Sequence, residues 1–178
     1  MMYNRSIKLD PCNEIIDGLF LGDHIASSNS FILKKHGITH VLSVGTGLYP
    51  KFPNKFTYKW INELDSPTAN LRQHFNACHK FMSSCFEKGG RILVHCYAGI
   101  SRSATMVISW LMREKGLSLN EAINTTRAKR WFINPNPGFM RQLRAFEKEL
   151  EMKGNRPAKS IYKLDDGNSM LMGNETND

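Results

Sequence analysis

The stretch that decides the fold reads RILVHCYAGISRSATMVISWLM and spans residues 91–112. Its first part is apolar in the centre, which predicts a buried strand. From Ser103 onward, apolar residues recur at helical spacing and predict a helix that ends near Gly116. A short polar turn containing Gly99 lies between them. A strand that enters a helix through such a turn can bind an anion, because the first helix amides have no partner within the helix.

The turn places Arg102 six residues after Cys96. A Walker A loop would need a Gly-Lys pair and a dinucleotide-binding loop a Gly-x-Gly-x-x-Gly run, and the turn has neither. A serine-hydrolase elbow would need glycine where Ser103 stands. The Cys-x5-Arg spacing instead predicts amides wrapped around a tetrahedral oxyanion, with the planar guanidinium holding two of its oxygens. The positive charge of the guanidinium and the partial charges of the amides also favour the nucleophilic thiolate form of Cys96.

Outward from this stretch, short apolar runs alternate with helical patterns. We expect strands at 14–23, 38–45 and 55–63, and helices at 28–37, 70–90, 117–130 and 136–154. Ser118 and Glu121 have the spacing of a capping box, and Asn136 with Pro137 fits a helix start. The sequence therefore predicts an α/β fold with a central, mostly parallel twisted sheet of about five strands, flanked by helices and helix-rich in its C-terminal half.

The 178 residues suit one catalytic domain, residues 14–153, with an N-terminal extension, 1–13, and a C-terminal tail, 154–178. Lys and Arg number 24 against 16 Asp and Glu, so the formal charge is +8 and favours anionic partners such as phosphorylated proteins. One dense basic run, RAKRW at 127–131, is most simply a solvated helix end, or else a docking or phosphate-facing patch. Charge alone does not indicate nucleic acid, and we expect none as a partner.

The chain shows neither a secretory signal nor an apolar run long enough to span a membrane. Its four cysteines, Cys12, Cys78, Cys85 and Cys96, are therefore expected as reduced thiols in a cytoplasmic and/or nuclear protein. Cys78 and Cys85 lie roughly 10.5 Å apart along a helix, which is too far for a disulfide. His74 and Cys78 lie one helical turn apart but lack further ligands, so we expect no metal site.

The residues His95-Cys96-x-x-Gly99-x-x-Arg102-Ser103 resemble the signature of the cysteine-dependent protein tyrosine phosphatase superfamily. The segments IIDGLFLGD, GITHVLSV, LDSPTANLRQHF and INPNPGFMRQLRAFE resemble its atypical dual-specificity branch, in the same order. The resemblance spans residues 14 to about 150. It implies the dual-specificity phosphatase fold, and a protein phosphatase that acts on phosphotyrosine and on phosphoserine or phosphothreonine without metal or cofactor. It does not imply an oligomeric state.

The family mechanism implies that Cys96 attacks phosphorus and forms a phosphocysteine, while an acid protonates the leaving group and later activates water. Asp65, in NELDSPTANL, matches the position of that acid. Glu63 is a competitor, although it falls within the strand pattern. The residues that the resemblance implies for phosphate binding are Tyr97, Ala98, Gly99, Ile100, Ser101 and Arg102.

Three further positions match supporting roles in the family. Ser103 matches the hydroxyl that stabilises the thiolate as a leaving group. His95 matches the residue that supports the loop and tunes the thiolate. Asn136 supports the site from behind or is only a helix cap.

Two other functions remain open. Phosphoinositide phosphatases of the superfamily carry lysines inside the loop, whereas the variable positions here are Tyr97, Ala98, Ile100 and Ser101. Glucan phosphatases usually add a carbohydrate-binding surface, which the sequence does not reveal. A catalytically weak phosphoprotein-binding adaptor would usually lack the cysteine, the arginine or the acid, and this chain has all three.

Overall fold

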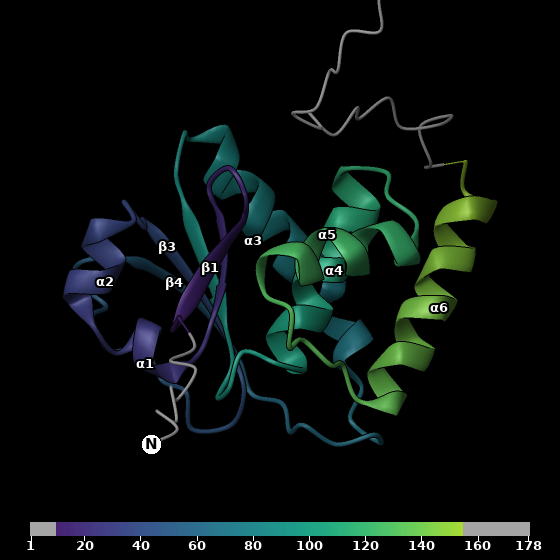
Figure 1. Ribbon diagram of the computed structural model, residues 1–178, viewed down its shortest axis with the longest axis horizontal. Helices are drawn as coiled ribbons and strands as arrows, with labels where there is room; N and C mark the ends of the chain where they lie inside the picture. Colours follow the sequence, from purple (N-terminus) through teal and green to yellow (C-terminus); the bar gives the residue numbers. More distant parts are fainter. Residues whose placement is uncertain (1–9, 155–178) are drawn as a thin grey trace, which may run out of the picture.

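The computed structural model describes residues 10–154, whose arrangement Figure 1 shows. A five-stranded sheet with the order β1-β2-β5-β3-β4 forms the centre. The strands are β1 Cys12–Ile16, β2 Leu19–Gly22, β3 His40–Val44, β4 Thr57–Ile61 and β5 Ile92–His95. β1 and β2 pair antiparallel, and the other neighbours pair parallel. The predicted α/β fold with a mostly parallel sheet is therefore confirmed. The predicted tail beyond Gly154 lies outside the described residues.

Helices cover both faces of the sheet. They are α1 His24–Ser27, α2 Ser30–Lys35, the short 3-10 helix η1 Leu71–His74, α3 Phe75–Glu87, α4 Arg102–Glu114, α5 Leu119–Lys129 and α6 Pro137–Met152. The four longest, α3 to α6, all follow β4, which confirms the helix-rich C-terminal half. Within residues 10–154, no helix has the length and apolarity needed to cross a membrane.

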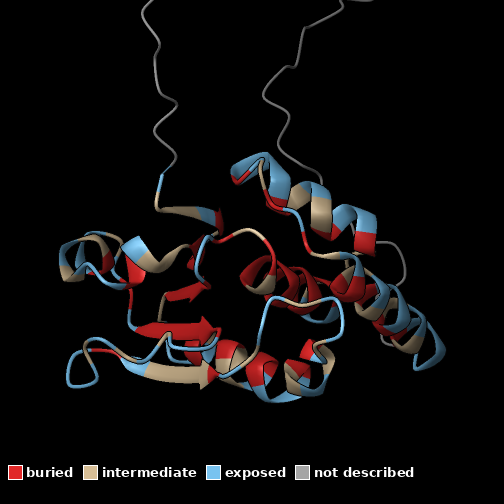
Figure 2. Ribbon diagram, turned by 90° about the horizontal axis from the view of Figure 1, so that it is seen from below, coloured by how far each residue is buried: buried red, intermediate tan, exposed pale blue. Residues whose placement is uncertain are grey.

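The side chains of β5 alternate between two separate hydrophobic cores. Ile92 and Val94 join the larger core with residues of α3, α4 and α6, whereas Leu93 joins a smaller core with residues of α1 and α2. This follows from the two-residue period of a strand, which sends successive side chains to opposite faces. Figure 2 shows the buried residues gathered on the sheet and on the helix faces turned toward it. The residue after β5, Cys96, therefore extends from a strand that is buried throughout.

Local capping signals fix where the C-terminal helices begin. The Ser118–Glu121 capping box is present at the start of α5. Asn136 caps α6, and its side-chain oxygen accepts a hydrogen bond from the Phe139 amide at 3.0 Å. Pro137 is the first residue of that helix, where its missing N–H costs no helical hydrogen bond. Both predicted helix starts are confirmed.

The single strand predicted at 14–23 is wrong. The chain forms a hairpin there, and β1 and β2 are joined by a turn at Asp17-Gly18. Gly18 has φ +76°, a conformation that glycine adopts freely, and its amide donates to the Glu14 carboxylate at 3.0 Å. An Asp-Gly pair between apolar runs is typical of such hairpins, so the signal was present in the sequence.

Candidate active site

The loop of residues 96–101 connects the end of β5 to the start of α4. Gly99 has φ +68° in this loop. A Cβ added to Gly99 would lie 2.6 Å from the Gly22 carbonyl oxygen and 2.6 Å from Arg130 Nη2. Only glycine fits here, because both the conformation and the surrounding space exclude a side chain. The 96–101 loop is therefore held tightly between β2 and the segment after α5.

The Cys96 thiol lies inside this loop and is buried. Its sulfur accepts hydrogen bonds from the Gly99 amide at 3.3 Å and from the Ser103 hydroxyl at 3.1 Å. It also lies at the N-terminus of α4, where the helix dipole is positive. Both donors and the helix terminus therefore direct positive partial charge at the sulfur.

The carbonyl groups of the loop are held on its outer side by the segment that follows α5. Arg130 donates from Nε to the Gly99 oxygen at 2.9 Å and from Nη2 to the Ala98 oxygen at 3.3 Å. The Asn134 amide donates to the Ile100 oxygen at 2.9 Å. All these peptide bonds are trans, so each carbonyl that points outward turns the next residue's N–H inward. Three successive amides therefore face the inside of the loop.

Histidines hold the first two carbonyls of the same loop. The Tyr97 oxygen accepts from the His24 amide at 3.0 Å and from His24 Nδ1 at 2.8 Å, while the two rings stack 4.4 Å apart. The Cys96 oxygen accepts from His95 Nδ1 at 3.2 Å. With these contacts, every backbone carbonyl from Cys96 to Ile100 accepts a hydrogen bond on the outer side of the loop. The loop thus presents its amides to whatever occupies its centre.

His95 is a neutral side chain with a defined tautomer. Burial lowers its pKa to about 4. A carbonyl oxygen can only accept, so Nδ1 carries the proton, and Nε2 then accepts from the Ser43 hydroxyl at 2.7 Å. His95 therefore links the neighbouring strand β3 to the carbonyl of Cys96.

Arg130 contacts the outer side of the loop, a position that the sequence analysis did not assign to it. The run RAKRW was expected to be a solvated helix end or else a docking or phosphate-facing patch, but Arg130 is 1% exposed and burial lowers its pKa. Beyond the 96–101 loop, its Nη1 donates to the Asp10 oxygen at 3.0 Å and to Asn13 Oδ1 at 2.7 Å. Its guanidinium also lies 4.4 Å from the centre of the Phe132 ring. Arg130 therefore joins the start of the described chain to the outer side of the loop.

Arg102, the first residue of α4, contacts the segments that follow β3 and β4. Its Nη1 donates to the Glu63 backbone oxygen at 3.2 Å, and its Nε lies 3.5 Å from Asp65 Oδ2. A Cβ at Gly45 would lie 2.6 Å from Nη1, so glycine at the end of β3 makes room for the guanidinium. The Nε atom is buried and makes no hydrogen bond with the described residues. The Asp65 carboxylate is the anionic group that faces this atom, at a distance longer than a normal hydrogen bond.

Asp65 lies beside the loop, and its carboxylate has a fixed orientation. Oδ1 accepts from the Ser101 hydroxyl at 2.7 Å and from Asn136 Nδ2 at 2.8 Å. The Ser101 hydroxyl accepts in turn from the backbone N–H of Asn136 at 3.1 Å. Asn136 therefore both caps α6 and holds Asp65, so the two readings of this residue are not exclusive. The side chain of Asp65 remains 33% exposed.

The competitor Glu63 faces different partners. Its Oε1 accepts from Gln73 Nε2 at 2.9 Å and lies 3.0 Å from His74 Nε2. His74 thus contacts Glu63, while Cys78 is buried and its pKa is raised to about 12 by burial. Within residues 10–154, no group of three or more possible metal-ligating side chains occurs.

Among the three remaining thiols, Cys85 lies 3.8 Å from the Thr39 hydroxyl, a longer contact than either of those made by Cys96. Burial raises the pKa of Cys12 to about 11, and it also raises the pKa of Cys85. All four cysteines are free. Cys96 is thus distinguished by its position in the loop and by its two hydrogen-bond donors.

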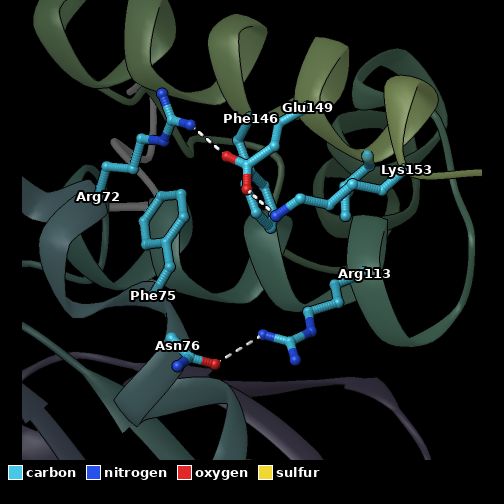
Figure 3. Close-up of a pocket in the computed structure, with 8 residues that line it drawn as sticks. Arg72, Phe75, Asn76, Arg113, Phe146, Glu149 and Lys153 are labelled. Carbon is cyan, nitrogen blue, oxygen red and sulfur yellow. Dashed lines mark hydrogen bonds and ion pairs between the residues drawn. The ribbon is translucent and has the colours of Figure 1, made fainter. Parts of the chain in front are cut away.

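A separate hollow of about 360 Å³ lies between η1, α3, α4 and α6 (Figure 3). Glu149 pairs there with Arg72 and with Lys153, the latter at 2.6 Å, and both partners lower its pKa. The rings of Phe75 and Phe146 form an apolar wall. None of its described lining residues is a cysteine, so this hollow is not a candidate for thiol chemistry.

Comparisons with known proteins identify the family of the chain. A family model described as "Dual specificity phosphatase, catalytic domain" matches residues 19–149. Over 139 residues the chain is 40% identical to dual specificity protein phosphatase 1B of Arabidopsis thaliana, covering 78% of this chain and 83% of that one. The solved structure of human DUSP28 matches with a TM-score of 0.77 at 30% identity, covering 80% of this chain and 97% of that one.

A second solved structure is the human tyrosine phosphatase-like serine/threonine/tyrosine-interacting protein. It matches with a TM-score of 0.75 at 35% identity, covering 79% of this chain and 97% of that one. The family match begins at β2 and ends in α6, so it includes the 96–101 loop, Arg102 and Asp65. The chain therefore belongs to the dual specificity phosphatase catalytic domain family and is a protein phosphatase.

Proposed function

We propose that this phosphatase hydrolyses phosphotyrosine and phosphoserine or phosphothreonine in proteins through a phosphocysteine intermediate. One observation carries the proposal: the Cys96 sulfur accepts two hydrogen bonds inside a loop whose amides are turned toward the same space. Such a loop supplies preorganised donors for the equatorial oxygens of a transferring phosphoryl group. Arg102 adds a fixed positive charge at its rim.

In the first step, the Cys96 thiolate attacks phosphorus in line with the leaving oxygen. The S–P bond forms as the P–O bond breaks, and Asp65 gives its proton to the departing oxygen. Oδ1 of Asp65 already accepts from Ser101 and Asn136. The transferable proton therefore belongs on Oδ2, the oxygen on the side of Arg102.

In the second step, water attacks the phosphocysteine. Asp65, now a carboxylate, takes a proton from that water, and the S–P bond breaks to release inorganic phosphate. The sulfur leaves as a thiolate, and the Ser103 hydroxyl, 3.1 Å away, stabilises its charge. No metal is needed in this scheme, because the loop amides and Arg102 balance the phosphate charge.

A non-protein substrate is the principal alternative. Against a phosphoinositide stand the lysine-free loop positions Tyr97, Ala98, Ile100 and Ser101, whereas a glucan phosphatase would usually add a carbohydrate-binding surface. Against an inactive adaptor stands the presence of Cys96, Arg102 and Asp65 at one site. Turnover should be compared on phosphopeptides, phosphoinositides and phosphorylated glucan, and activity confined to the last two would contradict the proposal.

The nucleophile is tested with Cys96→Ser. This variant should lose measurable turnover and still bind phosphate or vanadate, because the amides and Arg102 remain. Binding is measured by calorimetry and turnover by phosphate release from phosphopeptides. Residual full activity would overturn the assignment of Cys96.

A further inference from the structure

A hollow of about 440 Å³ lies beside the candidate general acid. Its walls are Thr46, from the loop after β3, and residues between Asn62 and Ala69. Both sequence neighbours of Asp65, Leu64 and Ser66, line it. The mechanism above assigns no role to this space.

The hollow adjoins the place where phosphate would bind. Thr46 follows Gly45, which lies against the Arg102 guanidinium. On the other wall, the Glu63 backbone oxygen accepts from Arg102 Nη1 at 3.2 Å. Neighbouring residues of an extended peptide are spaced about 3.4 Å apart along the chain, so a residue close to the phosphorylated one can reach the hollow.

The lining is uncharged except for one carboxylate. Thr46, Ser66 and Thr68 contribute hydroxyl groups, and the Ser66 and Thr68 hydroxyls lie 2.8 Å apart. Leu64 is 63% exposed and adds an apolar edge. Glu63 is the charged member, and none of the described lining residues is Lys or Arg. This one carboxylate makes the hollow unfavourable for an acidic guest.

We propose that this hollow is a substrate subsite that receives an uncharged side chain one or two positions from the phosphorylated residue. The inference rests on the proposed protein-phosphatase reaction and extends it to the neighbouring substrate residues. The overall charge of +8 would favour acidic sequences, but charges are screened beyond about 8–10 Å, so the nearby Glu63 carboxylate decides at this distance. Substrates with Leu or Thr beside the phosphoresidue are therefore preferred over those with Glu.

The test compares phosphopeptides that differ only at the positions next to the phosphoresidue. With the wild-type protein, kcat/KM for a Leu or Thr neighbour should exceed that for Glu by about fivefold or more, an electrostatic difference of roughly 1 kcal/mol. Thr46→Lys places a cation in the hollow and should remove or reverse this preference. Thr68→Lys, on a different part of the lining, provides a second variant. Both positions are exposed, so folding should not be affected.

Met152→Lys is the matched control. Met152 is 81% exposed at the end of α6, about 24 Å along that helix from Asn136, and it should leave the preference unchanged. Turnover of p-nitrophenyl phosphate, which has no peptide neighbours, should stay within about twofold in all three variants. An equal rate for Leu and Glu peptides in the wild type, or a preference unaltered by both lysines near Asp65, would overturn the subsite alone. Loss of all phosphopeptide turnover with p-nitrophenyl phosphate still hydrolysed would overturn the proposed function, and the subsite with it.

Discussion

The inner side of the 96–101 loop carries the Cys96 sulfur, the inward amides and, at its rim, Arg102. The outer side carries the loop's carbonyls, each bonded to a donor such as Arg130 or His24. The inner groups lie almost entirely within one continuous run of sequence, whereas the outer donors come from the start of α1, from β5 and from the segment after α5. Chemistry is therefore local in this chain, while the shape that makes the chemistry possible is assembled from distant segments.

We therefore expect substitutions on the inner side of the loop to lower the catalytic activity most. Arg102→Lys keeps a positive charge but loses the planar fork, so kcat/KM should fall by about 10³-fold. The affinity for inorganic phosphate, measured as competitive inhibition, should fall with it. The melting temperature should change little, because the side chain bonds only the Glu63 carbonyl and faces Asp65. A variant with near-normal kcat/KM would show that a positive charge without the planar fork is enough to hold the phosphate.

The next largest effect should come from Asp65→Asn, and it should depend on the leaving group. Serine and threonine alkoxides need the acid's proton, so kcat on a phosphoserine peptide should fall by about 10²-fold or more. On p-nitrophenyl phosphate, whose leaving group needs little protonation, the loss should be much smaller. Glu63→Gln is the matched control and should change neither rate by more than about twofold. Equal losses on both substrates would point to another acid, with Glu63 the first to examine.

On the outer side, Arg130→Lys should have a smaller effect on kcat, about tenfold, because one ammonium cannot hold both the Ala98 and Gly99 carbonyls. Phosphate affinity should weaken in parallel, since the amides lose their orientation. Asn13→Ala separates this role from stability, because it removes only an Nη1 partner. It should lower the free energy of unfolding by about 1 kcal/mol and leave turnover unchanged. If kcat falls in proportion to the free energy of unfolding in both variants, Arg130 stabilises the fold and does not orient the loop amides.

The smallest effect at neutral pH concerns His95, whose neutral form supports the Cys96 carbonyl. Its pKa is about 4 in the folded protein and about 6.5 when unfolded, so the unfolded chain binds the proton first on acidification. The free energy of unfolding should therefore fall by about 3 kcal/mol as the pH drops from 6.5 to 4, and that contribution is fully present above 6.5. His95→Asn should flatten this part of the curve, as measured by urea unfolding at each pH.

His79 gives a control for the same curve. Burial lowers its pKa to about 3, and its Nε2 lies 2.9 Å from the Ser109 hydroxyl in the helical core. His79→Phe should also reduce the loss of stability in acid. Because His79 has no contact with the 96–101 loop, phosphate affinity at neutral pH should stay unchanged. A fall in that affinity would mean that the core and the loop are coupled.

The sequence predicted the elements whose signals are short and continuous. The Ser118 capping box, the Asn136-Pro137 helix start and the buried β5 strand all depend on neighbours within a few residues. The Asp17-Gly18 hairpin was also readable, but the surrounding apolar run suggested one long strand.

Arg130 could not be recognised in the same way. In the sequence it is one of three basic residues beside Trp131, and nothing local distinguishes it from the exposed Lys129. Its burial depends on carbonyl groups of Ala98 and Gly99, about thirty residues away, which exist as acceptors only once the loop is folded. The inner-side residues were predictable because their spacing itself is the signal, whereas the outer side is a product of tertiary structure.

The different environments of the four thiols offer a practical assay. Burial keeps Cys12, Cys78 and Cys85 protonated well above neutral pH, so a small alkylating reagent should modify them slowly. Cys96, with its two donors, should be labelled first, and bound phosphate should block the reaction. Mass spectrometry of the labelled protein would then report the fraction of molecules with an intact loop without any substrate being known.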